Sequence, residues 1–187
     1  DGTLTTPEHR VDPRVFDLLP GWDAPVVFAT GKSFPYPVAL AHFLGLPENV
    51  VAENGGVVYA DGETTLAGDA EACWAVVEEF HRRGGDLAEY DQEVVDTGYA
   101  YHVKTPGVSK GAAFETLCET LRVDPERFVA VGDSVNDVST FAVAGESYAV
   151  ANADAAAREA ADRVLDGEYM DGTAALLEAL RADAAGP

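Results

Sequence analysis

Apolar residues follow two patterns that alternate along most of this chain. Short, nearly continuous apolar runs predict β-strands, and stretches in which apolar residues recur every three or four positions predict helices between them. The predicted strands cover residues 25–30, 49–52, 128–132, 147–150 and 163–165, and the predicted helices cover residues 13–19, 34–44, 111–121, 137–144 and 153–161. Short apolar strands separated by helices are typical of a doubly wound parallel sheet, so we expect an α/β fold.

The alternation is interrupted by one insert. A long helical pattern at residues 69–83 ends at Gly84-Gly85 and is followed by two strand-like runs, residues 86–95 and 99–104. A helix and two strands inside an α/β sequence indicate an added α+β unit. We therefore expect a core domain formed by residues 1–65 and 106–187 and a small cap domain formed by residues 66–105.

The charge of the chain restricts its partners. Among 187 residues, 33 are acidic and 12 are Lys or Arg, which gives a formal net charge of −21. Nucleic acids and anionic membranes would be repelled, so neither is expected as a partner. The acidic residues are spread along the chain, which is typical of a solvated surface. A salt-rich cytoplasm would suit such a surface, because the Debye length falls to about 3 Å at about 1 M salt.

Two further features favour a cytoplasmic setting. No apolar stretch approaches the ~20 residues that a membrane-spanning helix requires. Cys73 and Cys118 lie far apart in helical patterns and lack a Cys-x-x-Cys spacing, so we expect reduced thiols.

The four histidines, His9, His42, His81 and His102, have no metal-ligand spacing, and we interpret them as surface or packing residues.

A pair of carboxylates marks the end of a predicted strand. Asp133 and Asp137 lie four residues apart in Gly132-Asp133-Ser134-Val135-Asn136-Asp137, where the strand gives way to a helix. Ligands of open parallel sheets bind outside the carboxyl ends of the strands, and Mg²⁺ prefers carboxylate oxygens. The same residue types also cap helices well, so this motif alone leaves a metal site and a helix cap equally open.

Three more segments complete a recognisable order: Asp1-Gly2-Thr3, Thr30-Gly31-Lys32 and Ser109-Lys110-Gly111. Together with the Asp133 motif they resemble the haloacid dehalogenase (HAD) superfamily of aspartate-nucleophile phosphatases. The insert, the Thr-Gly-Lys segment and Glu53-Asn54-Gly55-Gly56 are similar to the Cof-type branch, and the modest length looks most like its archaeal phosphoglycolate phosphatases. The resemblance implies a Rossmann-like core with a C2-type cap.

The start of the chain departs from the family pattern. The family's first motif is Asp-x-Asp-Gly-Thr at the end of a central strand, with the first Asp as nucleophile, whereas this sequence begins at the second Asp. A doubly wound sheet without its central strand would leave neighbouring strands unpaired. We therefore expect the sequence to be truncated at its N-terminus and, as written, to lack its nucleophile.

The resemblance implies catalytic roles for Asp1, Thr30 and Lys110. Asp1 would protonate the leaving oxygen and then activate water, although a surface turn would have the same composition. Thr30 and Gly31 would bind phosphoryl oxygens, although Thr30 also fits a plain helix cap. Lys110 would bind the phosphoryl group and neutralise its charge.

The resemblance also implies a Mg²⁺ site and roles for other motif residues. Asp133 and the backbone carbonyl of Asp1 would be metal ligands, and Asp137 would bind the metal directly or through water. Asn136 would orient the motif or Lys110. Glu53 and Asn54 are given structural roles.

The expected function is Mg²⁺-dependent hydrolysis of a small phosphorylated metabolite through an aspartyl-phosphate, with 2-phosphoglycolate as the expected substrate. Alternatives are a Cof-like sugar or nucleotide phosphatase and a non-catalytic phosphate binder. A signalling receiver domain would use similar groups, but its Lys follows the hydroxyl residue on a late strand, and Lys110 opens a helix instead. In the cap, Tyr99, Tyr101 and His102 are candidates for substrate selection, with strand packing as the alternative for the tyrosines.

Overall fold

The computed structural model describes residues 1–83, 93–96 and 101–185, and it has an α/β architecture. Its first sheet has the order β1-β2-β3-β4, formed by Phe28–Ala29, Val50–Ala52, Val57–Ala60 and Glu63–Leu66. A second sheet, in the order β7-β8-β9, consists of Val129–Gly132, Glu146–Ala149 and Arg163–Val164. The α/β alternation is confirmed, but these strands form two hydrogen-bonded sheets rather than one.

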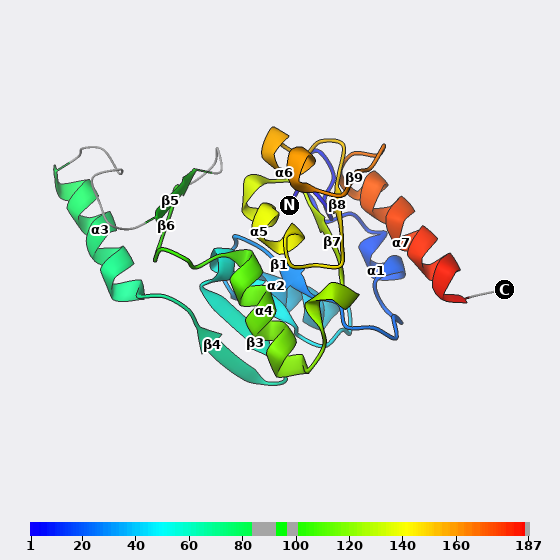
Figure 1. The fold of residues 1–187 in the computed structure, drawn as a ribbon, viewed down its shortest axis with the longest axis horizontal. Helices are drawn as coiled ribbons and strands as arrows, with labels where there is room; N and C mark the ends of the chain where they lie inside the picture. The colour runs from blue at the N-terminus through cyan, green and yellow to red at the C-terminus, as the bar shows by residue number, and fades with distance from the viewer. Residues whose placement is uncertain (84–92, 97–100, 186–187) are drawn as a thin grey trace.

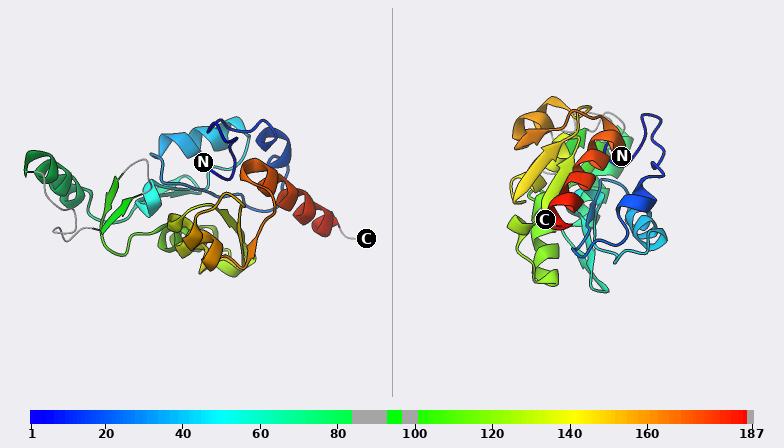
Figure 2. Two further views of the ribbon diagram at one scale, coloured as in Figure 1. Left: turned by 90° about the horizontal axis from the view of Figure 1, so that it is seen from above. Right: turned by 90° about the vertical axis from the view of Figure 1, so that its right-hand side faces the viewer.

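Helices cover both faces of the first sheet, because alternate residues of its strands point to opposite sides. Val51 packs with Ala113 and Leu117 of α4 (Lys110–Leu121), whereas Val50 packs on the side of Phe34 and Val38, the latter in α2 (Pro35–Phe43). Figure 2 shows α2 and α4 on opposite sides of the strands. This arrangement is that of a doubly wound fold.

The remaining helices complete the core. Helix α1 (Val15–Leu18) packs against α7 (Tyr169–Ala185), with Val15 and Met170 in one apolar cluster. Helices α5 (Val138–Phe141) and α6 (Ala155–Ala160) pack on the second sheet through Phe141 and Ala157. Short 3₁₀ turns lie at Glu53–Gly55, Pro125–Arg127 and Val135–Asp137. No helix among the described residues combines the length and apolar character that a membrane crossing requires.

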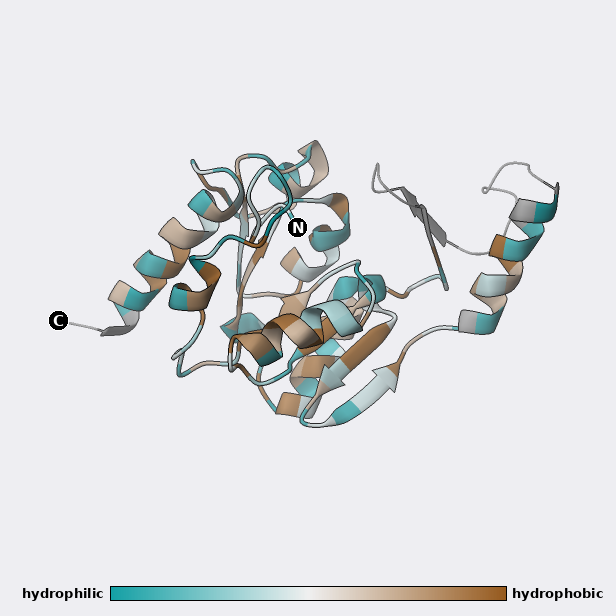
Figure 3. Ribbon diagram, turned by 180° about the vertical axis from the view of Figure 1, so that it is seen from behind, coloured by the Kyte–Doolittle hydropathy of each residue, from teal (hydrophilic) through white to brown (hydrophobic). Residues whose placement is uncertain are grey.

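Two parts of this fold were not predicted. The β3–β4 hairpin turns at Asp61-Gly62, where φ values of 52° and 79° match the left-handed pair of a two-residue turn. The strand next to β4 is largely apolar in Figure 3, whereas β4 is mostly pale to hydrophilic and its four residues are exposed. Helix α7 is the other element absent from the prediction. The Asp61-Gly62 pair could have predicted the hairpin turn. The apolar residues of α7 form only a weak stripe, so the helix was not evident from the sequence.

The insert lies to one side of the core (Figure 1). It contains α3 (Ala70–Arg83), which contacts β6, and the antiparallel strands β5 (Glu93–Asp96) and β6 (Tyr101–Lys104). The order of one helix and two strands is the predicted one, and the other residues of the two predicted strands lie outside the described residues. Cys73 in α3 and Cys118 in α4 are free thiols.

Candidate active site

Four separate segments meet at the carboxyl ends of β1 and β7. Thr30 and Gly31 directly follow β1, Asp133 directly follows β7, and Lys110 begins α4. The Asp1-Gly2-Thr3 segment joins them, because Lys32 Nζ lies 2.7 Å from Asp1 Oδ2 while Gly2 lies against Asp133. The carboxyl ends of parallel strands are where α/β folds bind ligands. The structure thus brings the predicted catalytic residues together.

Gly2 and Asp133 lie in direct contact in the site. Gly2 has a φ of +71°, and a β-carbon there would stand 1.9 Å from Asp133 Oδ2. Its carbonyl accepts a hydrogen bond from Asn152 Nδ2 at 3.2 Å, and Asn152 Oδ1 accepts one from the Tyr169 backbone N–H at 2.6 Å. Only glycine fits this position, because both its conformation and its neighbour exclude a side chain. Asn152, which the sequence did not indicate, therefore anchors the segment that covers Asp133.

The Asp133 carboxylate is suited to a cation. Burial and the neighbouring Asp137 carboxylate raise its pKa to about 6. Among the described residues, no hydrogen-bond donor is paired with its oxygens, and no cluster of three or more His, Cys, Asp or Glu side chains surrounds it. A half-buried carboxylate without a donor gains most from a positive ion. Mg²⁺ is commonly bound by one or two carboxylates with phosphate and water, so this donor set fits it.

Lys110 occupies a buried position with two partners. Its ammonium donates to Asp137 Oδ1 at 2.7 Å and to Asn136 Oδ1 at 3.0 Å, and its side chain is only 6% exposed. Ser109 caps the helix that it begins, since Ser109 Oγ accepts from the Ala112 N–H at 3.2 Å. Because two acceptors fix the ammonium, it is preorganised to meet negative charge.

Asp137 uses both of its oxygens within the protein. Oδ1 pairs with Lys110, and Oδ2 accepts the backbone N–H groups of Asp133 at 3.0 Å and Ser134 at 3.2 Å. The second set closes a capping box at the 3₁₀ turn. The predicted helix cap is therefore confirmed, and the same side chain also pairs with Lys110. Its geometry favours positioning Lys110 and Asp133, and direct metal ligation by Asp137 stays a prediction.

Thr30 and Gly31 form the turn after β1. Thr30 Oγ1 accepts the Lys32 N–H at 3.1 Å, which leaves the hydroxyl proton available to a phosphoryl oxygen. Gly31 lies beside Asn54, since a β-carbon there would stand 2.9 Å from Asn54 Oδ1. The predicted helix-cap role of Thr30 is wrong, because α2 begins only at Pro35 and its N-cap is Phe34, and phosphate binding by Thr30 stays a prediction.

Asn54 links the two halves of the site, a role that the sequence did not indicate. Its Oδ1 accepts a hydrogen bond from Asn136 Nδ2 at 2.9 Å, while its buried Nδ2 has no partner among the described residues. Both Glu53 and Asn54 have a φ of 54°, an unfavourable value for residues other than glycine. Such conformations persist where the surroundings enforce them, as they do at many binding sites. The Glu53-Asn54-Gly55-Gly56 motif was the available signal.

The structure describes only part of the three predicted cap residues. Tyr99 lies outside the described residues, and Tyr101 and His102 lie in β6, where only their backbone is described. Their predicted role in substrate selection stays a prediction.

Comparisons with known proteins identify the family of this chain. Residues 68–177 match the family model of the haloacid dehalogenase-like hydrolases. The chain is 59% identical to the phosphoglycolate phosphatase of Halorubrum lacusprofundi, over 97% of this chain and 94% of the relative. It is 47% identical to the phosphoglycolate phosphatase of Natronomonas pharaonis, over 96% of this chain and 93% of the relative.

Solved structures share the fold. A crystal structure from Thermoplasma acidophilum has a TM-score of 0.83 at 21% identity, covering 97% of this chain and 95% of that one. A haloacid dehalogenase-like hydrolase from Bacteroides thetaiotaomicron has a TM-score of 0.78 at 18% identity, with 96% of both chains covered.

Proposed function

The chain belongs to the haloacid dehalogenase-like hydrolases, and from that premise we propose that its site hydrolyses phosphomonoesters, with 2-phosphoglycolate as substrate. The observation that carries the proposal is the placement of the Asp133 carboxylate against Gly2 and of the buried Lys110 ammonium on Asp137, four residues further along. A fixed cation and a metal-binding carboxylate at one strand edge suit phosphoryl transfer, in which charge on the transferred group must be stabilised.

Each residue then has a specific task. In this family the nucleophile is the aspartate two positions before the equivalent of Asp1, a position that this sequence does not include. Asp1 would donate a proton to the leaving oxygen and later accept one from water, and its ion pair with Lys32 would hold it in reach. Thr30 and the backbone N–H groups near Gly31 would bind phosphoryl oxygens, and Lys110 would neutralise their charge.

Mg²⁺ would be bound by the Asp133 carboxylate and the backbone carbonyl of Asp1, with Asp137 as the further predicted ligand. When bound, the ion would offset negative charge on the phosphoryl oxygens. The raised pKa of Asp133 and its lack of protein donors support this assignment.

The substrate follows from the relatives and from the insert. Two relatives at 59% and 47% identity are named phosphoglycolate phosphatase.

We propose that residues 66–105 form the cap and residues 1–65 and 106–187 the core, as the separate position of α3, β5 and β6 in Figure 1 supports. The cytoplasmic location and the lack of nucleic-acid and membrane partners stay predictions from the sequence.

Steady-state kinetics of the full-length gene product test the proposal. We expect 2-phosphoglycolate to have a higher kcat/KM than glucose 6-phosphate or p-nitrophenyl phosphate, and EDTA to abolish turnover until Mg²⁺ is restored. Lys110→Ala should reduce turnover of all three esters by about 10²-fold or more. The control Arg127→Ala removes an exposed cation on a 3₁₀ turn and should have no effect. A parent protein with no preference for 2-phosphoglycolate would refute the substrate assignment.

A further inference from the structure

The side chain of Asn54 holds a hydrogen-bond donor that the described part of the chain does not pair. The residue is only 3% exposed, and its Nδ2 has no hydrogen-bond partner among the described residues. A buried amide donor without an acceptor carries the full cost of its lost hydration, and such groups are few in folded proteins. An unpaired donor of this kind at a candidate active site points to an acceptor on a ligand.

Lys110 fixes which end of the Asn54 amide is the unpaired one. An ammonium can only donate, so the Asn136 atom that lies 3.0 Å from Lys110 Nζ must be the carbonyl oxygen, Oδ1. Asn136 Nδ2 is then the donor toward Asn54, and the Asn54 atom 2.9 Å from it must be the acceptor, Oδ1. A reversed Asn54 amide would set two NH₂ groups against each other. The unpaired group is therefore an N–H donor, which can bind only an acceptor.

Two segments hold the Asn54 amide in place. The Asn54 backbone N–H donates to the Thr30 carbonyl at 3.2 Å, and a β-carbon at Gly31 would stand 3.2 Å from Asn54 Nδ2. On the other side, Gly55 lies against the residue before α4, because a β-carbon there would overlap the Ser109 carbonyl. The amide thus lies between the turn after β1 and the start of α4, the two segments proposed to bind the phosphoryl group.

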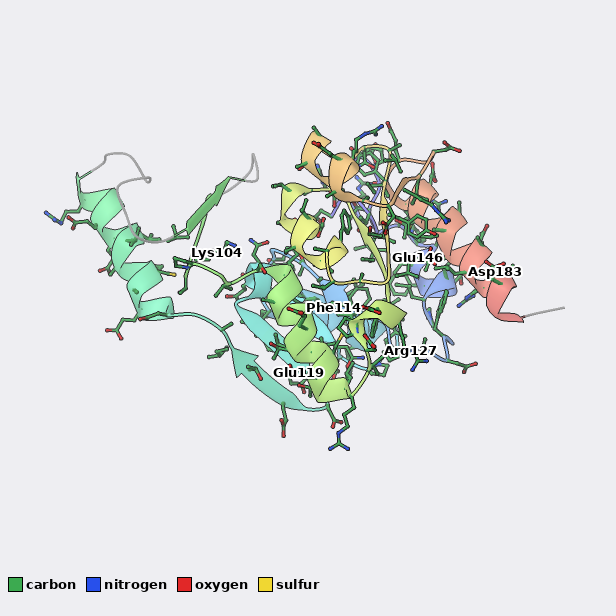
Figure 4. The ribbon with its side chains drawn as sticks, viewed as in Figure 1. Lys104, Phe114, Glu119, Arg127, Glu146 and Asp183 are labelled. Carbon is green, nitrogen blue, oxygen red and sulfur yellow. The ribbon has the colours of Figure 1, made fainter. Side chains whose placement is uncertain are left out.

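Asn54 lies on the wall of a pocket of about 350 Å³, which Lys110 and Asn136 also line. Lys110 is the residue of α4 in the described lining, and Phe114 and Glu119 lie further along that helix in Figure 4. The described lining contains no carboxylate, although the chain has 33 acidic residues. An acceptor that enters the pocket therefore meets an ammonium and an amide donor on one wall, which favours an anionic oxygen.

We propose that Asn54 is a substrate-binding residue whose Nδ2 donates a hydrogen bond to an oxygen of the phosphoryl group. The proposal rests on the function proposed above and adds a neutral donor beside the Lys110 ammonium. In the free protein the donor is buried and unpaired, so a phosphoryl oxygen that reaches it gains a charge-assisted hydrogen bond and relieves that cost. Because the contact is to the phosphoryl group, it should serve every phosphomonoester equally, whatever the leaving group.

Calorimetric titration with inorganic phosphate, in the presence of Mg²⁺, tests this contact in the full-length gene product. Asn54→Asp keeps the Oδ1 acceptor for Asn136 and replaces the donor by an oxygen, so Kd for phosphate should rise about 10- to 100-fold. The titration is done in about 1 M KCl, where a Debye length of about 3 Å limits general repulsion by the new carboxylate. The control Asn49→Asp changes another buried asparagine, at the opposite end of β2, and should leave Kd unchanged.

Asn54→Gly is the second variant, since glycine accepts a φ of 54° and removes the whole amide. We expect it to weaken phosphate binding as Asn54→Asp does, and both variants to lower kcat/KM for 2-phosphoglycolate and p-nitrophenyl phosphate by the same factor. Unchanged phosphate affinity in both variants would overturn the contact. Loss in Asn54→Gly alone would also overturn it and show that Asn54 only orients Asn136, and loss in Asn54→Asp alone would reduce the effect to charge. A parent protein that neither binds phosphate nor hydrolyses either ester would instead refute the proposed function, and the role of Asn54 with it.

Discussion

Gly2 and Asp133 are in direct contact, since a β-carbon at position 2 would stand 1.9 Å from Asp133 Oδ2. The contact joins the first residues of the sequence to the end of β7. Asn152 supports it by donating a hydrogen bond to the Gly2 carbonyl. The environment of the proposed metal ligand therefore depends on a residue that has no side chain.

Gly2→Ala should weaken Mg²⁺ binding by at least about 10-fold, because the methyl group must displace the Asp133 carboxylate. Gly21→Ala is the matched control. Gly21 also has a positive φ, +79°, but nothing lies within 4 Å of a β-carbon there. The control should show only the backbone strain, about 1 kcal/mol of unfolding free energy, with unchanged Mg²⁺ affinity by calorimetry. Equal affinities in both variants would remove the contact from the site.

Asp133→Asn should abolish measurable Mg²⁺ binding in a calorimetric titration, because an amide oxygen lacks the charge that Mg²⁺ requires. Asp124→Asn is the control, since Asp124 caps a 3₁₀ turn away from the proposed metal site. Unchanged affinity in Asp133→Asn would exclude Asp133 as a ligand.

In the metal-free protein, the free energy of unfolding should depend on pH because the pKa of Asp133 is raised. The pKa is raised to about 6 from 3.8, so the folded state retains a proton that the unfolded chain has released. Folding stability from this group is therefore full below about pH 4 and is lost as the pH rises through 6. Asp133→Asn should be about 3 kcal/mol more stable than the parent at pH 7.5 and equal to it near pH 4. Urea unfolding in EDTA measures this, and a constant difference across the range would contradict the assignment.

Asp137→Asn should destabilise the fold by about 3–5 kcal/mol, because it leaves the buried Lys110 ammonium without its carboxylate. The double variant Lys110→Met with Asp137→Asn should recover part of that loss, since it removes both charges. Urea unfolding of the three proteins gives the comparison. Loss of Mg²⁺ affinity in Asp137→Asn at unchanged stability would instead favour the metal-ligand role predicted from the sequence.

Stability should rise with KCl, because 33 acidic residues face 12 basic ones and salt screens their repulsion. Relatives from halophilic archaea are consistent with such behaviour. Thermal melts between 0.1 and about 2 M KCl test it, with sorbitol as an uncharged control. A melting temperature that stays flat or falls with KCl would show that repulsion is not limiting.

The sequence by itself determined the parts of this protein that depend on local pattern. Residues 128–132 read as a strand because four apolar residues precede a glycine, and Asp133 follows at once, so its place at a strand end was predictable. The helix that begins at Lys110 and the helix and strands of the insert were likewise predictable from period and turn residues. The HAD fold was implied by the family resemblance of the Asp1, Thr30, Lys110 and Asp133 motifs, and the comparisons confirm it.

Only the tertiary structure decided the contacts between distant residues. Asn54 and Asn136 are 82 positions apart, and Gly2 and Asn152 are 150 positions apart, yet each pair is hydrogen-bonded. The ion pair between Asp137 and Lys110 likewise became visible only in the structure, because these residues are 27 positions apart. The spacing of apolar residues specifies which face of a helix or strand is buried. Side-chain hydrogen bonds between distant residues depend on how separate elements pack, and no local pattern encodes that packing. The positions of Asn54 and Asn152 in the site therefore became visible only when the packed elements brought them together.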